Sequence, residues 1–158
     1  MPQLSLRSPI GDLSVSEEAG VIVALDWGWG SQQQATPLLR AAKRQLDCYF
    51  DGTPMTFDLP LAPQGTAFQV RVWEAMTVIP YGRTQTYGEI ARDLNSGPRP
   101  VGTACGRNPI PIIIPCHRVL AAGGALGGYS GDGGLDTKFA LLRLERADGF
   151  VDALPFAV

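Results

Sequence analysis

The N-terminal third of the chain alternates short apolar runs with turn residues and then changes to helical periodicity. Residues 1–26 read as short strands separated by glycine-containing turns. From Pro37 to Phe50 apolar side chains recur at intervals of three and four, which predicts an amphipathic helix that stops before Gly52. The stretch 51–65 reads as a linker. We therefore place a sheet-plus-helix subdomain over residues 1–62.

Two capping boxes indicate helix starts in the second half of the chain. In Thr66-Ala-Phe-Gln69 and in Thr86-Tyr-Gly-Glu89, a hydroxyl and a longer polar side chain can satisfy the free amides of a helix N-terminus. The first of these helices must end before Pro80. Its predicted buried face consists of Phe68, Val72, Ala75 and Ile79.

A third short helix follows closely and completes a helix-turn-helix pattern. Residues 95–98 form a turn and residues 99–107 read as a helix rich in small side chains. A last helix is expected over residues 136–147, with Asp136 as its N-cap. The predicted fold is α/β of the α+β kind, in which a mainly helical, winged-helix-like domain over residues 63–158 follows the small sheet.

Composition is that of an ordinary globular protein. The chain has 158 residues, of which 45% are apolar and 18% are charged. No apolar run approaches the roughly 18 residues of a membrane span, and the N-terminus lacks the pattern of a signal peptide. We expect a cytoplasmic protein with no membrane partner.

Charge is unevenly distributed along the chain. The net charge is −2, yet residues 81–146 carry eight Lys or Arg against five Asp or Glu. This basic half could face a polyanion, although the field is weak and chance explains the asymmetry equally well. Within it, Gly102 and Gly106 permit either close helix packing or close approach to a grooved surface such as DNA, with Arg99 and Arg107 at the helix ends.

Three cysteines, Cys48, Cys105 and Cys116, and a single histidine, His117, carry the candidate chemistry. Their spacing matches no metal-ligand pattern, so we expect neither a metal nor another cofactor. Cys48 and Cys105 lie in helical patterns without a neighbouring base and are predicted to be inert.

Cys116 follows an isoleucine-rich segment, residues 110–114, that is predicted to be extended and buried. Pro115 restricts the chain just before the thiol. A cysteine beside the only imidazole is a candidate nucleophile, because a free thiol is only about 3% thiolate at pH 7 and needs a base. The alternative is a structural cysteine beside a surface histidine.

Glu145 falls on the same helical face as Lys138, Leu141 and Leu142, where an unpaired carboxylate is costly. His117 is a suitable partner, which would give a Cys–His–Glu chain. The alternative is that Glu145 extends outward to solvent. Asn108, before Pro109, either braces the cysteine loop or simply caps a helix.

Several motifs together resemble the O6-alkylguanine-DNA alkyltransferase family. The specific element is Pro115-Cys116-His117-Arg118-Val119, and the resemblance covers nearly the whole chain. The other matching segments are Ser8–Leu13, Gln45-Leu46 through Tyr49-Phe50, Gly65–Gln69, Val72-Trp73, Ile79–Gly82, Tyr87–Ala91, Asn108-Pro109 and Gly128–Gly131.

The resemblance implies direct DNA repair by a monomer on double-stranded DNA containing O6-alkylguanine. The base is rotated out of the duplex, and Cys116 takes the alkyl group irreversibly in one turnover, with O4-alkylthymine as a further substrate. It implies that His117 acts as the base through a water, that Glu145 orients the imidazole, and that Asn108 orders the turn that carries the cysteine. Tyr87 is implied to rotate the nucleotide and to protonate the guanine. Arg99 is implied to fill the gap in the base stack, and Tyr129 and Ser130 to line the pocket.

The sequence departs from the family pattern in two loops and at one proline. Pro100 stands where the family usually has Ala, the turn 95–98 is about two residues short, and the stretch 130–135 is about two residues long. The longer glycine-rich stretch predicts tolerance of bulkier lesions. Two rival functions stay open, a non-catalytic alkyl-lesion recognition protein and a cysteine hydrolase that uses Cys116 and His117.

Overall fold

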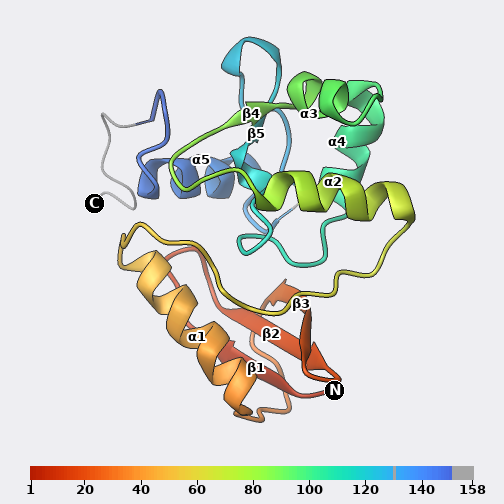
Figure 1. Ribbon diagram of the computed structural model, residues 1–158. Helices are drawn as coiled ribbons and strands as arrows, with labels where there is room; N and C mark the ends of the chain where they lie inside the picture. Colours follow the sequence, from red (N-terminus) through yellow and green to blue (C-terminus); the bar gives the residue numbers. More distant parts are fainter. Residues whose placement is uncertain (130, 151–158) are drawn as a thin grey trace.

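A three-stranded antiparallel sheet and one helix form the N-terminal part of the computed structural model, which describes residues 1–129 and 131–150. The strands β1 (Gln3–Leu6), β2 (Leu13–Glu18) and β3 (Val21–Trp27) lie in sequence order. Helix α1 (Pro37–Phe50) packs against β1 and β2 (Figure 1). The predicted strands and the predicted bounds of α1 are confirmed.

The segment between α1 and the second half runs along the free edge of the sheet. Ile22 N donates to Pro60 O at 2.8 Å, and Ala62 N donates to Ile22 O at 2.9 Å. This expected linker is therefore fixed to β3 by backbone hydrogen bonds on both sides of Leu61.

The second half of the chain is mainly helical, as predicted. It contains α2 (Ala67–Thr77), β4 (Gln85–Thr86), α3 (Tyr87–Asp93), α4 (Pro98–Gly106), the 3-10 turn η1 (Cys116–Arg118), β5 (Val119–Leu120), the 3-10 turn η2 (Ala122–Gly124) and α5 (Gly134–Leu144). Helices α3 and α4 form a helix-turn-helix that packs against α2. Strands β4 and β5 pair in parallel over two residues each, which does not confirm the winged-helix likeness.

Both predicted capping boxes are present. Thr66 accepts from Gln69 N at 3.1 Å while Gln69 Oε1 accepts from Thr66 N at 2.9 Å. Thr86 and Glu89 repeat this reciprocal pair at the start of α3. The short helix α3 begins where it does because the capping box satisfies two free amides at its N-terminus locally.

The predicted buried face of α2 was wrong in part. Phe68 and Ala75 are only partly buried, whereas Trp73 and Met76 lie in the core together with Val72. Trp73 Nε1 donates to Ala104 O of α4 at 2.8 Å. The packing of α4 on α2 therefore turns the indole inward, which the sequence of α2 alone does not indicate.

The predicted bounds of the last helix were also wrong. Helix α5 begins at Gly134 after Gly133, whose φ is 84°, so Asp136 lies in the first turn and is not the N-cap. The helix ends at Leu144 and Glu145 is its C-cap. Gly133 can adopt the left-handed conformation that starts the helix early because it has no Cβ.

The isoleucine segment is buried but not extended as predicted. Ile112 has a φ of 75°, and Ile114 N donates back to Ile110 O at 2.9 Å. All four isoleucines of this tight turn lie in the core. A non-glycine residue held at positive φ is strained, so surrounding packing must maintain the turn.

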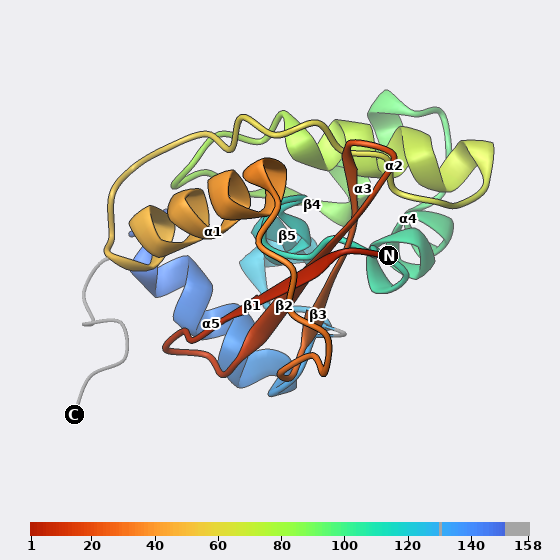
Figure 2. The same cartoon turned by 90° about the horizontal axis from the view of Figure 1, so that it is seen from below.

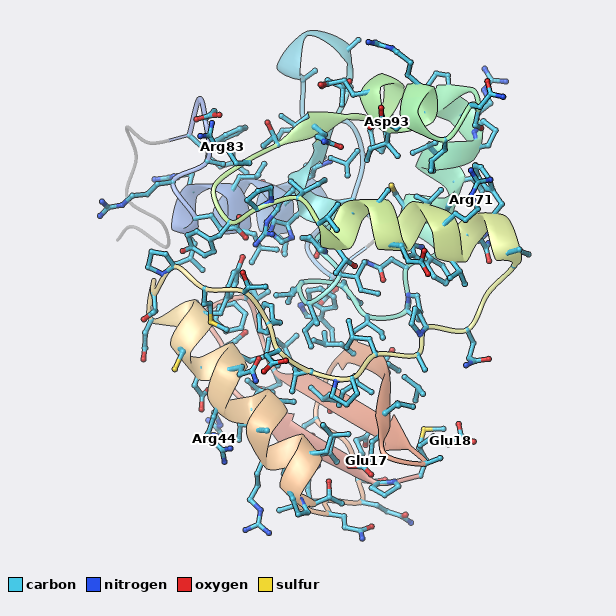
Figure 3. The ribbon with its side chains drawn as sticks, in the orientation of Figure 1. Glu17, Glu18, Arg44, Arg71, Arg83 and Asp93 are labelled. Carbon is cyan, nitrogen blue, oxygen red and sulfur yellow. The ribbon has the colours of Figure 1, made fainter. Side chains whose placement is uncertain are left out.

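One continuous apolar core joins the sheet, α1 and the helical half. Among the charged side chains labelled in Figure 3, Glu17 and Glu18 project from the sheet, far from Arg71 and Asp93 near the helix-turn-helix. The views in Figures 1 and 2 place the C-terminal ends of α1 and α5 near each other. Among the residues described, no helix is both long and apolar enough to cross a bilayer.

Candidate active site

Cys116 is the first residue of η1 and reaches a pocket of about 430 Å³. Its side chain is 5% exposed. The pocket is lined by Tyr87 of α3, Gly102, Cys105 and Gly106 of α4, and Gly128 and Tyr129 of the loop before α5. The thiol is therefore approached from the side of the helix-turn-helix.

His117 follows Cys116 in sequence but does not line this pocket. It is fully buried, and its Nε2 lies 2.6 Å from Glu145 Oε2. Nδ1 is also buried and finds no hydrogen-bond partner among the described residues. With the proton on Nε2 donated to the carboxylate, Nδ1 keeps a free lone pair and is available as an acceptor or base.

Glu145 is the centre of the buried polar cluster. Arg118 binds it with two groups, Nε to Oε1 at 2.8 Å and Nη2 to Oε2 at 3.0 Å. Gly82 N donates to Oε1 at 3.2 Å, and the Tyr49 hydroxyl donates to Oε2 at 2.6 Å. The structure thus brings Glu145 and His117 together and excludes the outward orientation of the carboxylate.

The electrostatics of this cluster favour an ionised carboxylate and a neutral imidazole. Burial opposes the charge on Glu145, but the neighbouring His117 and Arg118 hold its pKa below its usual value. Burial lowers the pKa of His117, and the Glu145 carboxylate opposes this shift only in part. A neutral imidazole at pH 7 is the form that can accept a proton.

The thiol itself is protonated in this environment. Burial raises the pKa of Cys116, while Asn108 and Lys138 act in the opposite direction. A protonated thiol and a neutral histidine form a pair in which the base must remove the proton when the substrate is in place.

Asn108 braces the turn that carries the cysteine. Its Nδ2 donates to Ile114 O at 2.8 Å, and its Oδ1 accepts from Ile110 N at 2.9 Å. One amide side chain therefore closes both ends of the isoleucine turn, which favours the first of the two roles that the sequence left open, bracing the cysteine loop, over a helix cap.

Lys138 is a buried cation that sequence reasoning placed on the α5 face without assigning a role. Its Nζ donates to Val119 O at 2.6 Å and to Gly128 O at 2.9 Å, and lies 5.6 Å from the Tyr87 ring centroid. Burial lowers its pKa to about 8. The signal in the sequence was a lysine between apolar neighbours at helical spacing.

Two tyrosines, Tyr87 and Tyr129, form part of the pocket wall. The Tyr87 hydroxyl donates to Gly128 O at 3.5 Å, and burial raises its pKa to about 12. The Tyr129 hydroxyl is buried and has no partner among the described residues. A phenol without a partner costs free energy and is suited to bind a polar group of a ligand.

The remaining predicted residues are less closely tied to the pocket. Arg99 is exposed on the first turn of α4. Ser130 lies outside the described residues. Cys48 is exposed, whereas Cys105 lines the pocket beside Cys116, and burial raises the pKa of Cys105 to about 12, which keeps it protonated. Within the described ranges no cluster of metal-ligating side chains is found.

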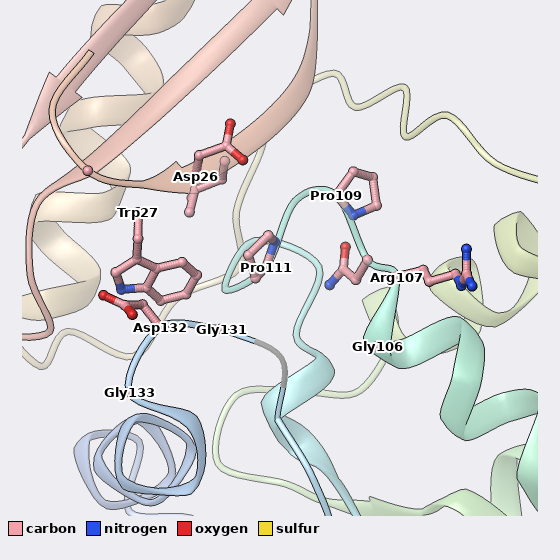
Figure 4. A pocket seen from close by; sticks show the side chains of 12 residues that line it. Asp26, Trp27, Gly106, Arg107, Pro109, Pro111, Gly131, Asp132 and Gly133 are labelled. Carbon is pink, nitrogen blue, oxygen red and sulfur yellow. The ribbon is translucent and has the colours of Figure 1, made fainter.

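A second hollow of about 720 Å³ lies behind the cysteine loop, between β3 and the C-terminal end of α4 (Figure 4). Asp26, Arg107 and Asp132 are among its polar lining residues, but Cys116 is not. Although it is the larger hollow, it lacks the nucleophile, so the smaller pocket is the candidate active site. Asn108 contributes to its wall and thus lies between the hollow and the cysteine turn.

The fold and the site define a helix-turn-helix protein with a cysteine pocket backed by a buried His–Glu–Arg cluster. Two family models match the chain: 6-O-methylguanine DNA methyltransferase, ribonuclease-like domain, over residues 4–63, and 6-O-methylguanine DNA methyltransferase, DNA binding domain, over residues 67–147. The chain belongs to the 6-O-methylguanine DNA methyltransferase family.

Relatives and solved structures agree with this assignment. The methylated-DNA–protein-cysteine methyltransferase of Methanosarcina acetivorans is 44% identical over 149 residues, covering 88% of this chain and 94% of the relative. The constitutive enzyme of that name from Bacillus subtilis is 41% identical over 89% of this chain and 92% of its own. The crystal structure of Mycobacterium tuberculosis OGT in complex with DNA matches with a TM-score of 0.83 and 41% identity, over 92% and 93% of the two chains.

Proposed function

We propose that this protein repairs alkylated DNA as a methylated-DNA–protein-cysteine S-methyltransferase, transferring the alkyl group from O6 of guanine to Cys116. The observation that carries the proposal is a buried thiol on the floor of a pocket that opens beside a helix-turn-helix. Names of relatives at 41–44% identity over most of the chain support the same reaction.

The transfer balances without a cofactor. The proton of the thiol passes to Nδ1 of His117 through a water, and the sulfur attacks the alkyl carbon. A carbon–sulfur bond forms while the carbon–O6 bond breaks, and Tyr87 supplies a proton to the leaving guanine. Tyr87 then takes up one proton from solvent, and the His117 imidazolium releases one to solvent. The thioether formed on Cys116 has no leaving group that water displaces readily, so each molecule acts once.

The cluster around Glu145 prepares His117 for this step. The carboxylate fixes the proton on Nε2, which leaves the Nδ1 lone pair free to accept a proton. Arg118 keeps the carboxylate ionised, so the imidazolium formed during transfer is stabilised at the moment it appears.

DNA contacts are assigned to the helix-turn-helix face. We place Arg99, on the exposed first turn of α4, in the gap left when the base rotates out of the stack, because a side chain in that gap offsets part of the unstacking cost. Tyr129 and Ser130 are assigned to the wall that holds the rotated base, and O4-alkylthymine is a second substrate. The functional division is a scaffold over residues 1–62 and an alkyl-transferring domain over residues 63–158.

Mass spectrometry of the protein after incubation with a duplex containing O6-methylguanine tests the proposal. We expect a gain of one methyl group on a peptide containing Cys116, with one guanine restored per protein molecule. Cys116→Ser should bind the duplex with wild-type affinity and gain no mass. Binding without a mass gain in the wild type would identify a lesion-recognition protein, and repeated turnover of an ester or amide would identify a cysteine hydrolase.

A further inference from the structure

Tyr49 reaches from the N-terminal part of the chain into the polar cluster of the helical half. It lies in the last turn of α1 and is fully buried. Its hydroxyl donates to Glu145 Oε2 at 2.6 Å and lies 3.4 Å from His117 Nε2. Tyr49 does not line the cysteine pocket, so any influence on the reaction passes through Glu145 and His117.

Three donors share one oxygen of the carboxylate. Oε2 of Glu145 accepts from the Tyr49 hydroxyl, from His117 Nε2 and from Arg118 Nη2, whereas Oε1 accepts from Arg118 Nε and Gly82 N. Donors that compete for one oxygen weaken one another, so the phenol limits how strongly the carboxylate binds the imidazole N–H. A weaker bond to the carboxylate lowers the basicity of the imidazole.

The phenol is held in this position by an aromatic cluster. Phe50, Phe57 and Tyr81 surround the ring, with centroids at 5.2 Å, 5.6 Å and 6.1 Å from that of Tyr49. Side chains packed in this way have few accessible rotamers. The hydroxyl is therefore a fixed donor.

Four titratable or charged side chains from three parts of the chain face the phenol. His117 and Arg118 come from η1, Glu145 from the end of α5 and Tyr81 from the loop before β4. Burial first, and then the charge on Glu145, raise the pKa of Tyr49 well above its usual value. The phenol therefore stays protonated and remains a donor at neutral pH. Lys138 of α5 does not contact the phenol, but its charge helps to lower the pKa of the His117 imidazole.

We infer that Tyr49 is a positioning residue through which the N-terminal domain sets the basicity of His117. The inference rests on the proposed function, in which His117 accepts the thiol proton. It also assigns the N-terminal sheet and helix a part in the reaction, because α1 delivers the hydroxyl that shares the Glu145 oxygen. The family model of the N-terminal domain ends at residue 63, so the hydrogen bonds that join Tyr49, Glu145 and His117 link the two matched domains.

The test compares Tyr49→Phe with the matched control Tyr81→Phe. Both variants remove one phenolic oxygen from the same aromatic cluster, but the Tyr81 hydroxyl donates to Leu144 O at 3.5 Å and not to the carboxylate. Because the chain contains one histidine, the imidazole resonances in an untagged, isotope-labelled protein belong to His117. Two quantities are measured: the Nε2–H proton shift, and the pH dependence of the single-turnover rate on an O6-methylguanine duplex.

In Tyr49→Phe the Nε2–H resonance moves to lower field, because the imidazole no longer shares Oε2 with the phenol. The acid limb of the rate profile moves to higher pH by about half a unit to one unit, since the imidazole is protonated more readily. Tyr81→Phe keeps both quantities at their wild-type positions.

The inference is overturned if either the resonance or the acid limb of Tyr49→Phe stays where the control has it, even when the variant melts at a lower temperature. That result would make Tyr49 a packing residue only. Failure of the proposed function is recognised separately, because wild-type protein would then gain no mass on Cys116 while the resonance comparison remains measurable.

Discussion

The indole of Trp27, at the end of β3, meets the ring of Tyr129 edge-on, with ring centroids 6.4 Å apart and an interplanar angle of 84°. Trp27 Nε1 donates to Ile10 O at 3.1 Å, which fixes the indole on the N-terminal sheet. The sheet therefore supports one wall of the cysteine pocket, whereas helix α1 contributes Tyr49 to the polar cluster behind it.

Gly131 lies close to both rings, and Figure 4 shows it near Trp27. A Cβ at this position would overlap Cε2 of Tyr129 and approach Cη2 of Trp27 to 2.8 Å. Gly131→Ala should push Tyr129 into the pocket and slow transfer of a benzyl group more than transfer of a methyl group, by about tenfold in the rate ratio. Gly88→Ala, whose Cβ meets nothing closer than 3.8 Å, is the control. An unchanged ratio would show that Tyr129 does not limit pocket size.

The carboxylate of Glu145 should dominate acid stability. Its pKa is held low, so its contribution is present above about pH 4.3 and is lost as the pH falls through the folded-state value. His117 has a lowered pKa, so the unfolded chain takes up its proton first and the free energy of unfolding already falls below about pH 6.5. Glu145→Gln should cost about 3–5 kcal/mol at pH 7, because Arg118 is left buried and unpaired. Urea titrations at several pH values measure both effects, and a wild-type stability that is flat from pH 7 to pH 5 would contradict the account.

The lowered pKa of Lys138 affects the alkaline side of the pH dependence of stability. Its folded-state pKa of about 8 lies below the 10.5 of an exposed lysine, so the unfolded chain holds the proton more tightly in that interval. The contribution of Lys138 to the free energy of unfolding therefore rises with pH between these values. Raised thiol and phenol pKa values act in the reverse direction, so the quantity to measure is the difference between wild type and Lys138→Met. A difference that does not grow in favour of the wild type from pH 8 to pH 10 would exclude a depressed pKa.

Asn108 supports the cysteine turn with two hydrogen bonds, and its loss leaves Ile114 O and Ile110 N without these partners. Asn108→Ala should lower the free energy of unfolding by about 2–3 kcal/mol. Asn108→Asp keeps the acceptor for Ile110 N but replaces the donor to Ile114 O with a charged oxygen. It should therefore slow the single-turnover rate at least as much as Asn108→Ala. An Asp variant with a wild-type rate would show that the Nδ2 donor is dispensable.

Alkylation should destabilise the product. Cys116 is almost completely buried, and an added methyl group enters its pocket against the residues that line it, where overpacking costs about 1–3 kcal/mol. Calorimetry before and after stoichiometric reaction should show a lower melting temperature for the alkylated protein. Mock-treated Cys116→Ser serves as the control, and a product that melts at or above the unreacted protein would contradict the prediction.

Local signals in the sequence were sufficient for most of the secondary structure. The capping residues Thr66 and Thr86 start their helices where predicted because each capping hydrogen bond joins residues only three positions apart in the sequence. The bounds of α5 were missed because Gly133 starts the helix through a left-handed conformation that its sequence permits but does not require. The turn at Ile112 was missed for a related reason, since nothing local favours positive φ at an isoleucine.

The sequence alone determined the family, the nucleophile candidate at Cys116 and the neighbourhood of His117 and Glu145, because those signals lie in a contiguous motif and in one helical face. Only the tertiary structure decided which side chains complete the cluster. Tyr49 is 96 positions from Glu145 along the chain, and in the sequence it was one apolar member of a helix face. Helical periodicity reports that a side chain is buried but carries no information about what it is buried against. The partner is set by how α1, η1 and the end of α5 pack together.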